Sequence, residues 1–395
     1  MLARHQGQVV LVWGAVPGER VKARVERPGK GVLYAETVEV LDASPDRVDV
    51  GPADWRCGGN VFAHVAYDRQ LQLKGEILRD ALGRIGRLPL TSTPRVIGSP
   101  QQGYRMRARL HARGDRLGFY REGTHDLCAP GPTGQLLPTT IAWIESAQAV
   151  LREGRLDGVL ALEIAENIPA DERATHVELR EGVDPRPYEV LVTERTSVTD
   201  VLHAREGDSS TALRLRRDVR AFFQGNRYLL ERLVHHVLAL VPPGPVVDLY
   251  AGVGLFGLSL AAAGAEHVTL VEGDPISGAD LAGNAEPFRD RVRVERRSVE
   301  AFLAGPLRAD PSARGTRPTY VVDPPRTGMS RDAMREIIRA RPARLVYVSC
   351  DVATLARDTR LLLDADYSLD QLTGIDLFPN TAHVESVATF ARNAG

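Results

Sequence analysis

Residues 246–257 are Val-Val-Asp-Leu-Tyr-Ala-Gly-Val-Gly-Leu-Phe-Gly. The apolar start predicts a short buried strand, and the three glycines predict a tight turn that opens into a helix. Free N–H groups at the start of that helix would face any ligand that the glycines allow close to the backbone. This order of elements predicts an α/β fold with a nucleotide-type site, although the glycine spacing alone would also suit a nicotinamide dehydrogenase.

Three acidic residues lie at or near the ends of predicted strands in this region. Asp248 precedes the glycines, where a carboxylate can meet the cationic methionine part of S-adenosylmethionine. Glu272 ends the apolar run at 268–271, a position that suits two ribose hydroxyls. Asp323 follows the run at 320–322 and precedes two prolines, which fix the backbone there. Each acid alone could equally be a loop cap or a surface charge, but their order along the chain favours an S-adenosylmethionine site.

A thiol and a carboxylate follow further downstream. Cys350 comes directly after the apolar run at 345–348 and Ser349, and Glu385 lies in the segment His-Val-Glu at 383–385. A thiol at the carboxyl end of a buried strand sits where open α/β sheets place their chemistry. Cys350 as nucleophile and Glu385 as base predict covalent catalysis beside a bound cofactor. The alternative is a buried structural cysteine, which is common in strands.

The pattern of predicted elements divides the chain into three domains. Short strands with turns between them predict a small β-barrel over residues 1–50. Residues 51–205 predict a central β-rich α+β domain, whose helix at 66–88 can pack on the catalytic domain. From 206 to 395, helices and strands alternate, which predicts a Rossmann-like domain with a mostly parallel sheet. Residues Ala309 to Pro318 predict a surface loop.

The composition of this 395-residue chain excludes several protein classes. Its hydrophobic content of 43% and charged content of 26% are typical of globular proteins. Its apolar runs are too short or too interrupted to cross a bilayer, and its N-terminus lacks the apolar core of a signal peptide. Three cysteines without an obvious pairing pattern fit a reducing cytoplasm.

The formal net charge is −1, so any nucleic-acid surface must be local. A basic stripe lies between Tyr104 and Arg121, and its candidate RNA-binding residues are Arg105, Arg107, Arg109 and Arg121. Alternation with period two predicts that the first three share one face of a strand. Such a face suits phosphate contacts, but a solvated sheet face is the equally weighted alternative.

Five ordered segments resemble the RNA 5-methyluridine methyltransferases. They are 222–226 (Phe-Phe-Gln-Gly-Asn), 248–254 (Asp-Leu-Tyr-Ala-Gly-Val-Gly), 323–328 (Asp-Pro-Pro-Arg-Thr-Gly), 349–358 (Ser-Cys-Asp-Val-Ala-Thr-Leu-Ala-Arg-Asp) and 376–385 (Asp-Leu-Phe-Pro-Asn-Thr-Ala-His-Val-Glu). The opening segment also resembles the TRAM domain, a small RNA-binding barrel. The resemblance implies an enzyme that methylates uridine carbon 5 in RNA, with ribosomal RNA favoured over transfer RNA as the substrate. No obligate protein partner is evident, and the expected location is cytoplasmic.

The resemblance also implies residue roles. Cys350 would add to carbon 6 of uracil, Glu385 would remove the carbon-5 proton, and Asp323 would orient the uracil edge. The residues at positions implied for S-adenosylmethionine are Gln224, Asp248, Tyr250, Gly252, Gly254, Glu272 and Asp323. A target base must leave its stack to reach such a pocket, which implies a flipped base or a single-stranded loop.

One motif of the family is degenerate. Many members with a TRAM domain hold a four-iron cluster through four cysteines, and the matching positions here are Gly51, Cys57, Asn60 and Cys128. A four-iron cluster commonly takes four thiolates, so we expect no cluster and no other metal, with Cys57 and Cys128 left as packed thiols.

Two rival functions stay open at this point. One is an RNA cytosine-C5 methyltransferase, although that class resembles this chain less around its nucleophile. The other is an RNA-binding protein that has lost its activity.

Overall fold

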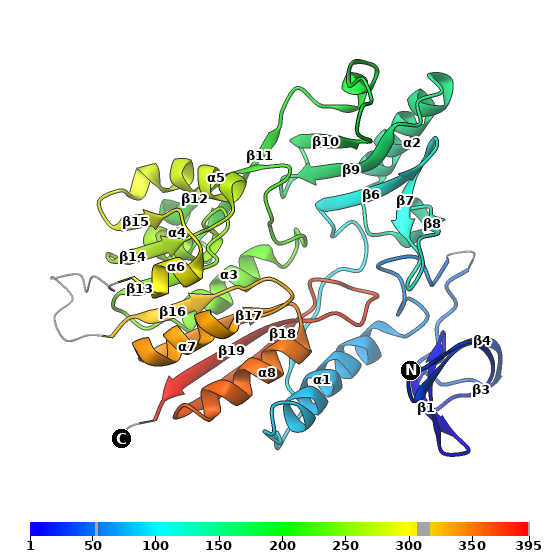
Figure 1. The fold of residues 1–395 in the computed structure, drawn as a ribbon, viewed down its shortest axis with the longest axis horizontal. Coiled ribbons are helices and arrows are strands. Elements are labelled where there is room, and N and C mark those ends of the chain that lie inside the picture. The colour runs from blue at the N-terminus through cyan, green and yellow to red at the C-terminus, as the bar shows by residue number, and fades with distance from the viewer. Residues whose placement is uncertain (52–53, 306–316, 394–395) are drawn as a thin grey trace.

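The structure is a computed structural model that describes residues 1–51, 54–305 and 317–393. The loop expected at 309–318 lies outside the described residues up to position 316. Three sheets dominate the molecule (Figure 1): a large one at the C-terminal end of the chain, a central one, and a small one formed by the N-terminus. No helix within the described part of the chain is long and apolar enough to span a membrane.

The large sheet has eight strands in the order β15-β14-β13-β16-β17-β19-β18-β5. Its strands are β13 (Val246–Leu249), β14 (Val268–Val271), β15 (Val292–Glu295), β16 (Thr319–Val322), β17 (Arg344–Ser349), β18 (Tyr367–Ile375), β19 (Glu385–Arg392) and β5 (Val96–Ile97). The first five in spatial order run parallel, and β19 runs antiparallel to both of its neighbours. Parallel strands buried on both faces need near-continuous apolar sequence, which is what β13, β16 and β17 carry.

Helices cover both faces of this sheet. They are α3 (Leu230–Ala239), α4 (Leu255–Ala262), α5 (Pro275–Ala285), α6 (Val299–Leu303), α7 (Arg331–Ala340) and α8 (Val352–Leu363). Alternate residues of β17 enter different cores: Val346 and Val348 pack with α3, α4 and α5, whereas Leu345 and Tyr347 pack with α6, α7 and α8. The predicted Rossmann-like fold is confirmed by this three-layer arrangement.

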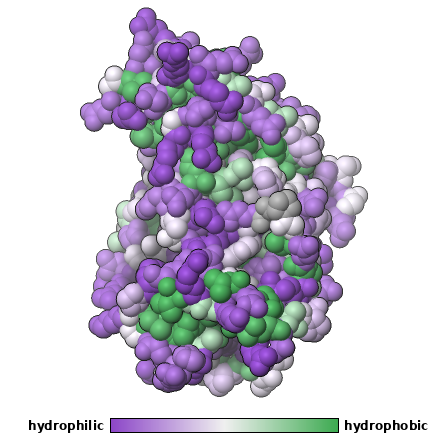
Figure 2. All heavy atoms as spheres, turned by 90° about the vertical axis from the view of Figure 1, so that its right-hand side faces the viewer, coloured by the Kyte–Doolittle hydropathy of each residue, from purple (hydrophilic) through white to green (hydrophobic). Residues whose placement is uncertain are grey.

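The N-terminal sheet is small and open. Its strands, in the order β1-β2-β4-β3, are β1 (Leu2–His5), β2 (Gln8–Trp13), β3 (Arg20–Gly29) and β4 (Val32–Asp42). Because β1 and β3 form its edges, the barrel predicted for residues 1–50 is not closed by hydrogen bonds. Figure 2 shows hydrophobic residues gathered on the lower part of one face of the molecule, over this sheet; the exposed ones include Leu2, Val25, Val38 and Leu41.

The central sheet is antiparallel and has one helix against it. Its strands are β6 (Arg107–Arg113), β7 (Arg116–Tyr120), β8 (Leu127–Cys128), β9 (Val159–Glu166) and β10 (Arg173–Leu179), and the helix is α2 (Pro138–Glu153). A hairpin of β11 (Ser197–His203) and β12 (Ala212–Asp218) follows. The boundary predicted at 205/206 falls inside this hairpin. Since Arg216 N–H donates to Asn284 in α5 over 3.0 Å, β12 packs on the catalytic domain.

Two elements from the first hundred residues belong to the large sheet. Strand β5 pairs with β18, and helix α1 (Tyr67–Arg84) packs against α8. Figure 1 shows α1 between α8 and the N-terminal sheet. The helix predicted over 66–88 spans Tyr67–Arg84, so it ends four residues earlier than expected. A division of the chain into three consecutive domains does not describe this arrangement, because the catalytic sheet is built from both halves.

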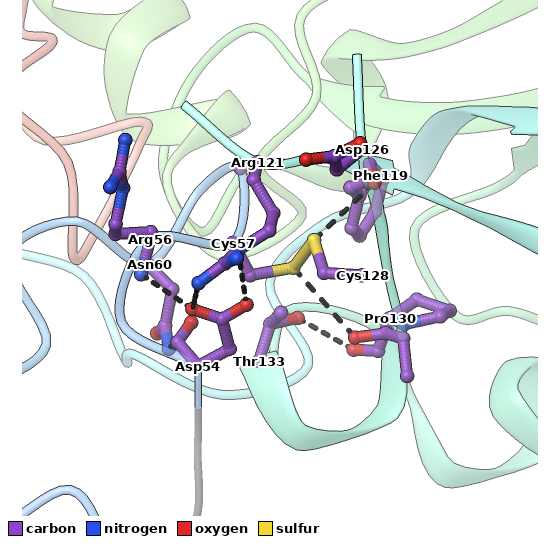
Figure 3. Close-up of a disulfide and its surroundings, with 12 residues drawn as sticks. Asp54, Arg56, Cys57, Asn60, Phe119, Arg121, Asp126, Cys128, Pro130 and Thr133 are labelled. Carbon is purple, nitrogen blue, oxygen red and sulfur yellow. Dashed lines mark hydrogen bonds and ion pairs between the residues drawn. A yellow bond between two sulfur atoms is a disulfide. The ribbon is translucent and has the colours of Figure 1, made fainter. Parts of the chain in front are cut away.

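A disulfide joins Cys57 to Cys128 (Figure 3). The prediction that Cys57 and Cys128 are packed thiols is therefore wrong. The argument for a reducing compartment also fails, because it assumed three unpaired cysteines. The bond ties the segment at 54–60 to the end of β8, beside an ion pair of 2.8 Å between Arg121 and Asp54. Asn60, a third position of the degenerate motif, is buried and donates to the Asp54 carbonyl over 3.4 Å. These residues do not fit an iron-sulfur cluster, since the two thiols at the motif positions are bonded to each other.

Removing this disulfide should destabilise the protein. A disulfide that closes a long loop restricts the unfolded chain, so the double variant Cys57→Ser/Cys128→Ser should lose about 2–4 kcal/mol of unfolding free energy. Urea unfolding of the wild type with and without dithiothreitol supplies the comparison. Dithiothreitol should lower the urea midpoint of the wild type and leave the urea midpoint of the double variant unchanged. An equal change in both proteins would contradict the disulfide.

Candidate active site

The predicted site residues converge on one edge of the large sheet. Asp323 directly follows β16, and Cys350 directly follows β17. In the antiparallel pair of β17 and β19, Ser349 lies opposite Ser386. Cys350 directly follows β17 and Glu385 is the first residue of β19, so both adjoin this pair. The predicted nucleophile and the predicted base therefore lie close together, and the charge of Glu385 contributes to the raised pKa of Cys350.

The glycine-rich turn between β13 and α4 lies at the same edge. Gly252 and Gly254 have φ angles of 58° and 102°, a region that favours glycine. A side chain on Gly254 would collide with Leu258, and one on Gly257 would collide with Leu270 and Asp248. At Gly252, in contrast, an added Cβ would meet nothing within 4 Å. The turn is therefore packed from behind and open at Gly252.

Two acidic residues, Asp248 and Glu272, accept hydrogen bonds from the backbone of this turn and of the helix that follows it. Asp248 is fully buried, and its Oδ2 accepts a hydrogen bond of 2.8 Å from Gly257 N–H. Within residues 1–51, 54–305 and 317–393, its Oδ1 has no hydrogen-bond partner. Glu272 accepts 2.7 Å from Gly252 N–H and 2.6 Å from Asp274 N–H. The unsatisfied oxygen of this buried carboxyl group, beside an open glycine turn, fits a polar ligand, and S-adenosylmethionine carries polar groups.

Tyr250 contributes to the turn in a different way from its neighbours. Its φ of 63° lies in the left-handed region, and its side chain packs against the core formed with α6 and α7. Burial, followed by the charges of Glu300 and Asp358, raises the pKa of its hydroxyl. The cofactor role predicted for Tyr250 stays a prediction.

Replacing Asp248 with asparagine should make the protein more stable at neutral pH. Burial, reinforced by the charges of Asp323 and Glu272 and opposed by Gly257 N–H, raises the pKa of Asp248 to about 8. Above its ordinary pKa of about 3.9 the unfolded chain releases this proton while the folded protein keeps it, so Asp248 costs stability as pH rises. Asp248→Asn should therefore gain about 2–4 kcal/mol at pH 7. The gain should shrink toward pH 4 in urea unfolding, and a gain independent of pH would contradict the assignment.

Glu385, which is buried, and Asp323, which is partly buried, are carboxyl groups close to Cys350. Gln224, from the loop before α3, donates 3.2 Å from Nε2 to Oδ2 of Asp323. Both oxygens of Glu385 lack a hydrogen-bond partner among the residues that the structure describes, and the residue is 1% exposed. Burial raises the pKa of both carboxyls, and the charge of Asp323 raises that of Glu385 further. An unsatisfied buried carboxyl group is costly, so this arrangement points to function.

Cys350 is half-buried and is the one cysteine outside the disulfide. Burial raises its pKa to about 11, with further contributions from Glu385 and Asp323. Arg326 opposes this shift by its charge and by a hydrogen bond to the thiol. Arg326 also lies 3.2 Å from the ring nitrogens of His383. The site thus holds a thiol that needs a base or a cation to react at neutral pH.

Comparison with known proteins places the chain in a family. A family model described as tRNA (Uracil-5-)-methyltransferase matches residues 316–393, a range that contains Asp323, Cys350 and Glu385. The 23S rRNA (uracil(1939)-C(5))-methyltransferase RlmD of Halomonas elongata is 32% identical over 96% of this chain and 84% of the relative. This chain belongs to the RNA uracil-C5 methyltransferase family. The RlmD protein of Pseudomonas putida is 31% identical over 98% of this chain and 90% of its own length.

A solved structure of another family member has the same overall fold. The Pyrococcus abyssi tRNA (uracil-54, C5)-methyltransferase, in complex with S-adenosyl-L-homocysteine, aligns with a TM-score of 0.76 and 25% identity. The alignment covers 97% of this chain and 95% of the other. These comparisons confirm the predicted family, the predicted enzyme class and the predicted dependence on S-adenosylmethionine.

The basic stripe is less free than predicted. Arg109 is paired with Glu163 and Glu178, and Arg121 is paired with Asp54. Arg105 donates 2.7 Å to Gln135. Arg107 lies over the ring of Phe222, 5.8 Å from the centroid, and Phe222 is 62% exposed two residues before Gln224. Carboxylates neutralise Arg109 and Arg121, and RNA binding by these two stays a prediction. Of the four arginines, Arg107 contacts the segment that leads to Gln224.

Sequence reasoning missed the partners of the loop that ends at Glu385. His383 was quoted only as part of a motif, and Lys74 and Gln70 of α1 were not singled out. Both α1 residues are fully buried and contact this loop. No local pattern connects residues about 300 positions apart, so only the fold could reveal them.

Proposed function

We propose that this protein methylates carbon 5 of a uridine in RNA, with Cys350 as nucleophile and Glu385 as general base. The observation that carries the proposal is that both residues adjoin the last pair of β17 and β19, with Glu385 and Asp323 near enough to Cys350 for their charges to raise its pKa. Carbon 5 of uracil is a poor nucleophile, so methyl transfer needs a group that first activates the ring. A thiol and a carboxylate on either side of one site supply both halves of that chemistry.

The reaction has three steps: addition, methyl transfer and elimination. The thiolate of Cys350 adds to carbon 6 of uracil, and the electron pair moves to carbon 5 and the carbon-4 carbonyl. S-adenosylmethionine, when bound, supplies an electrophilic methyl group that carbon 5 attacks. Glu385 then removes the carbon-5 proton, and the electron pair that is released re-forms the ring double bond and expels the Cys350 thiolate.

Asp323 fits the orientation of the ring. Its Oδ2 is already held by Gln224, and burial favours its neutral form. A neutral carboxyl can donate a hydrogen bond to a uracil carbonyl, as buried acids do in other enzymes. The hydrogen bond from Gln224 fixes the orientation of the Asp323 carboxyl group. Asp323 and Gln224 would therefore act on the uracil base and not only on S-adenosylmethionine.

Ribosomal RNA is the substrate that the relatives favour, because the two proteins described above act on 23S rRNA. The target uridine would be flipped or unpaired, since the site lies in a buried sheet edge. Arg107 and the exposed Phe222 lie where an RNA backbone and a base could be held. We place this reaction in the cytoplasm, where RNA is modified.

Mapping of methylated nucleosides tests this proposal. RNA from cells with and without the gene, digested and measured by mass spectrometry, should differ in 5-methyluridine at one or a few positions. A difference in 5-methylcytidine would support a cytosine methyltransferase instead. No difference in either nucleoside, together with RNA binding by the purified protein, would indicate a binding protein without activity.

The rate of adduct formation should rise with pH. If the thiolate attacks, the rate constant for adduct formation with 5-fluorouridine RNA should increase about tenfold per pH unit below the pKa of Cys350. Removing the opposing cation in Arg326→Gln should raise that pKa further and slow the step about tenfold at pH 7.5. Arg326→Lys keeps the charge and serves as the matched control. A rate that does not change between pH 7 and pH 9 would contradict attack by a thiolate with a raised pKa.

A further inference from the structure

The loop at 376–384 connects β18 to β19 and determines where Glu385 lies. Glu385 is the first residue of β19, so its side chain follows directly from the path of this loop. Buried Leu377 and Val384 anchor the two ends of the loop, whereas Asn380 and Thr381 in its middle are buried polar residues, and Asn380 has a left-handed φ of 62°. The polar middle of the loop therefore needs hydrogen-bond partners to hold it in one conformation.

Helix α1 supplies those contacts from one face. Tyr67, Gln70 and Lys74 are spaced three and four residues apart, which places them on the same side of the helix. Tyr67 hydroxyl donates 2.9 Å to Asp376, and Lys74 Nζ donates 2.5 Å to Asp376 and 2.9 Å to the Phe378 carbonyl.

Gln70 holds the middle of the same loop. Its Oε1 accepts 3.0 Å from Asn380 N–H, and its Nε2 donates 3.0 Å to Asn380 Oδ1. The first residue of the loop has a further backbone partner, because Asp376 N–H donates 2.8 Å to the carbonyl of Ile97 at the end of β5. The loop is thus fixed at its start, its middle and one carbonyl between them.

These contacts are directional and completely buried. The side chains of Lys74 and Asp376 are both 0% exposed. Burial lowers the pKa of Lys74, and the charge of Asp376 opposes that shift. Apolar side chains of similar size would bury as much surface and are often no less stable than a buried ion pair. Hydrogen bonds, unlike apolar contacts, specify the orientation of the loop.

The far end of α1 contacts the other catalytic element. Ala81 and Leu82 pack against Ala356 of α8. Helix α8 begins directly after Cys350, with Asp351 as its capping residue. One helix therefore touches both the loop that leads to Glu385 and the helix that follows Cys350.

We propose that Tyr67, Gln70 and Lys74 are positioning residues that hold Glu385 at the correct place relative to Cys350. This inference rests on the proposed role of Glu385 as the base. It predicts a specific defect: when the loop shifts, adduct formation and methyl transfer still occur, but the carbon-5 proton is removed slowly. The covalent RNA adduct should then accumulate.

The test uses the full chain, S-adenosylmethionine and a 23S rRNA transcript that contains ordinary uridine. Lys74→Met should lower turnover about 100-fold, as expected for a misplaced catalytic group, and the adduct should be visible on a denaturing gel. Gln70→Leu is the second variant, in case Lys74→Met does not fold. Leu151→Ala, in the fully buried core of the central domain, serves as a control for lost stability alone.

The outcomes separate this inference from the proposed function. Glu385→Gln should accumulate the adduct; if it does not, the role of Glu385 is wrong. If Glu385→Gln accumulates the adduct, but folded Lys74→Met and Gln70→Leu turn over at the rate of Leu151→Ala, the positioning role is overturned. The same holds if these variants lose activity without any adduct, because the defect then lies before proton removal.

Discussion

Replacing Cys350 with alanine should abolish methylation and leave the fold intact. The nucleophile forms a covalent bond that no neighbouring group can replace, so turnover should fall by about 10⁴-fold or more. Cys350 is half-buried at the end of β17, so the smaller side chain leaves little empty volume in the core. The same variant should form no adduct with 5-fluorouridine RNA, in which the fluorine at carbon 5 blocks release of the wild-type enzyme.

Two controls make this result specific. Calorimetric binding of S-adenosylmethionine to Cys350→Ala should match the wild type, because the turn at 252–254 and Asp248 are untouched. The Cys57→Ser/Cys128→Ser variant should still form the adduct, because the two replaced cysteines lie in the central domain. An adduct in Cys350→Ala would disprove the assignment of the nucleophile.

Glu385→Gln should stop the reaction one step later. Proton removal by a positioned base contributes about 10²–10⁴-fold, and an amide cannot accept this proton. Methyl transfer should still occur, so a methylated adduct with ordinary uridine RNA should accumulate on denaturing gels. Because both Glu385 oxygens lack hydrogen-bond partners, glutamine should be tolerated structurally and should not lower the melting temperature.

The position of the blocked step distinguishes the two variants. Labelled methyl groups should appear in the trapped adduct of Glu385→Gln and be absent from Cys350→Ala. If Glu385→Gln instead releases 5-methyluridine at a normal rate, another group removes the proton, and Asp323 would be the first to examine.

The sequence could predict the acidic residues and the cysteine that lie at the ends of buried strands. The short β-branched runs of β13, β14, β16 and β17 carry a two-sided burial signal, and Asp248, Glu272, Asp323 and Cys350 lie within or directly after them. Parallel strands end at the same edge, so the order of these residues was enough to bring them together. The antiparallel insertion of β19, which brings Glu385 to this edge, was not predicted, because the alternation of helices and strands predicts a mostly parallel sheet.

Pairings between distant segments were not predictable in the same way. The spacing of Cys57 and Cys128 gives no sign that they bond, because a separation of 71 residues constrains neither geometry nor partner. The charge pattern around Arg109 likewise predicts an exposed cation but not the carboxylates of Glu163 and Glu178 beside it. Both follow from tertiary packing, which local propensity does not encode.

The Cys57–Cys128 bond also determines what this protein needs in order to mature. A link made by two sulfur atoms needs an electron acceptor and two lost protons, but no iron and no assembly factors for a metal cofactor. Such a link forms and breaks by exchange with other thiols. The junction between the segment at 54–60 and β8 should therefore follow the thiol balance of the cell and remain intact when iron is scarce.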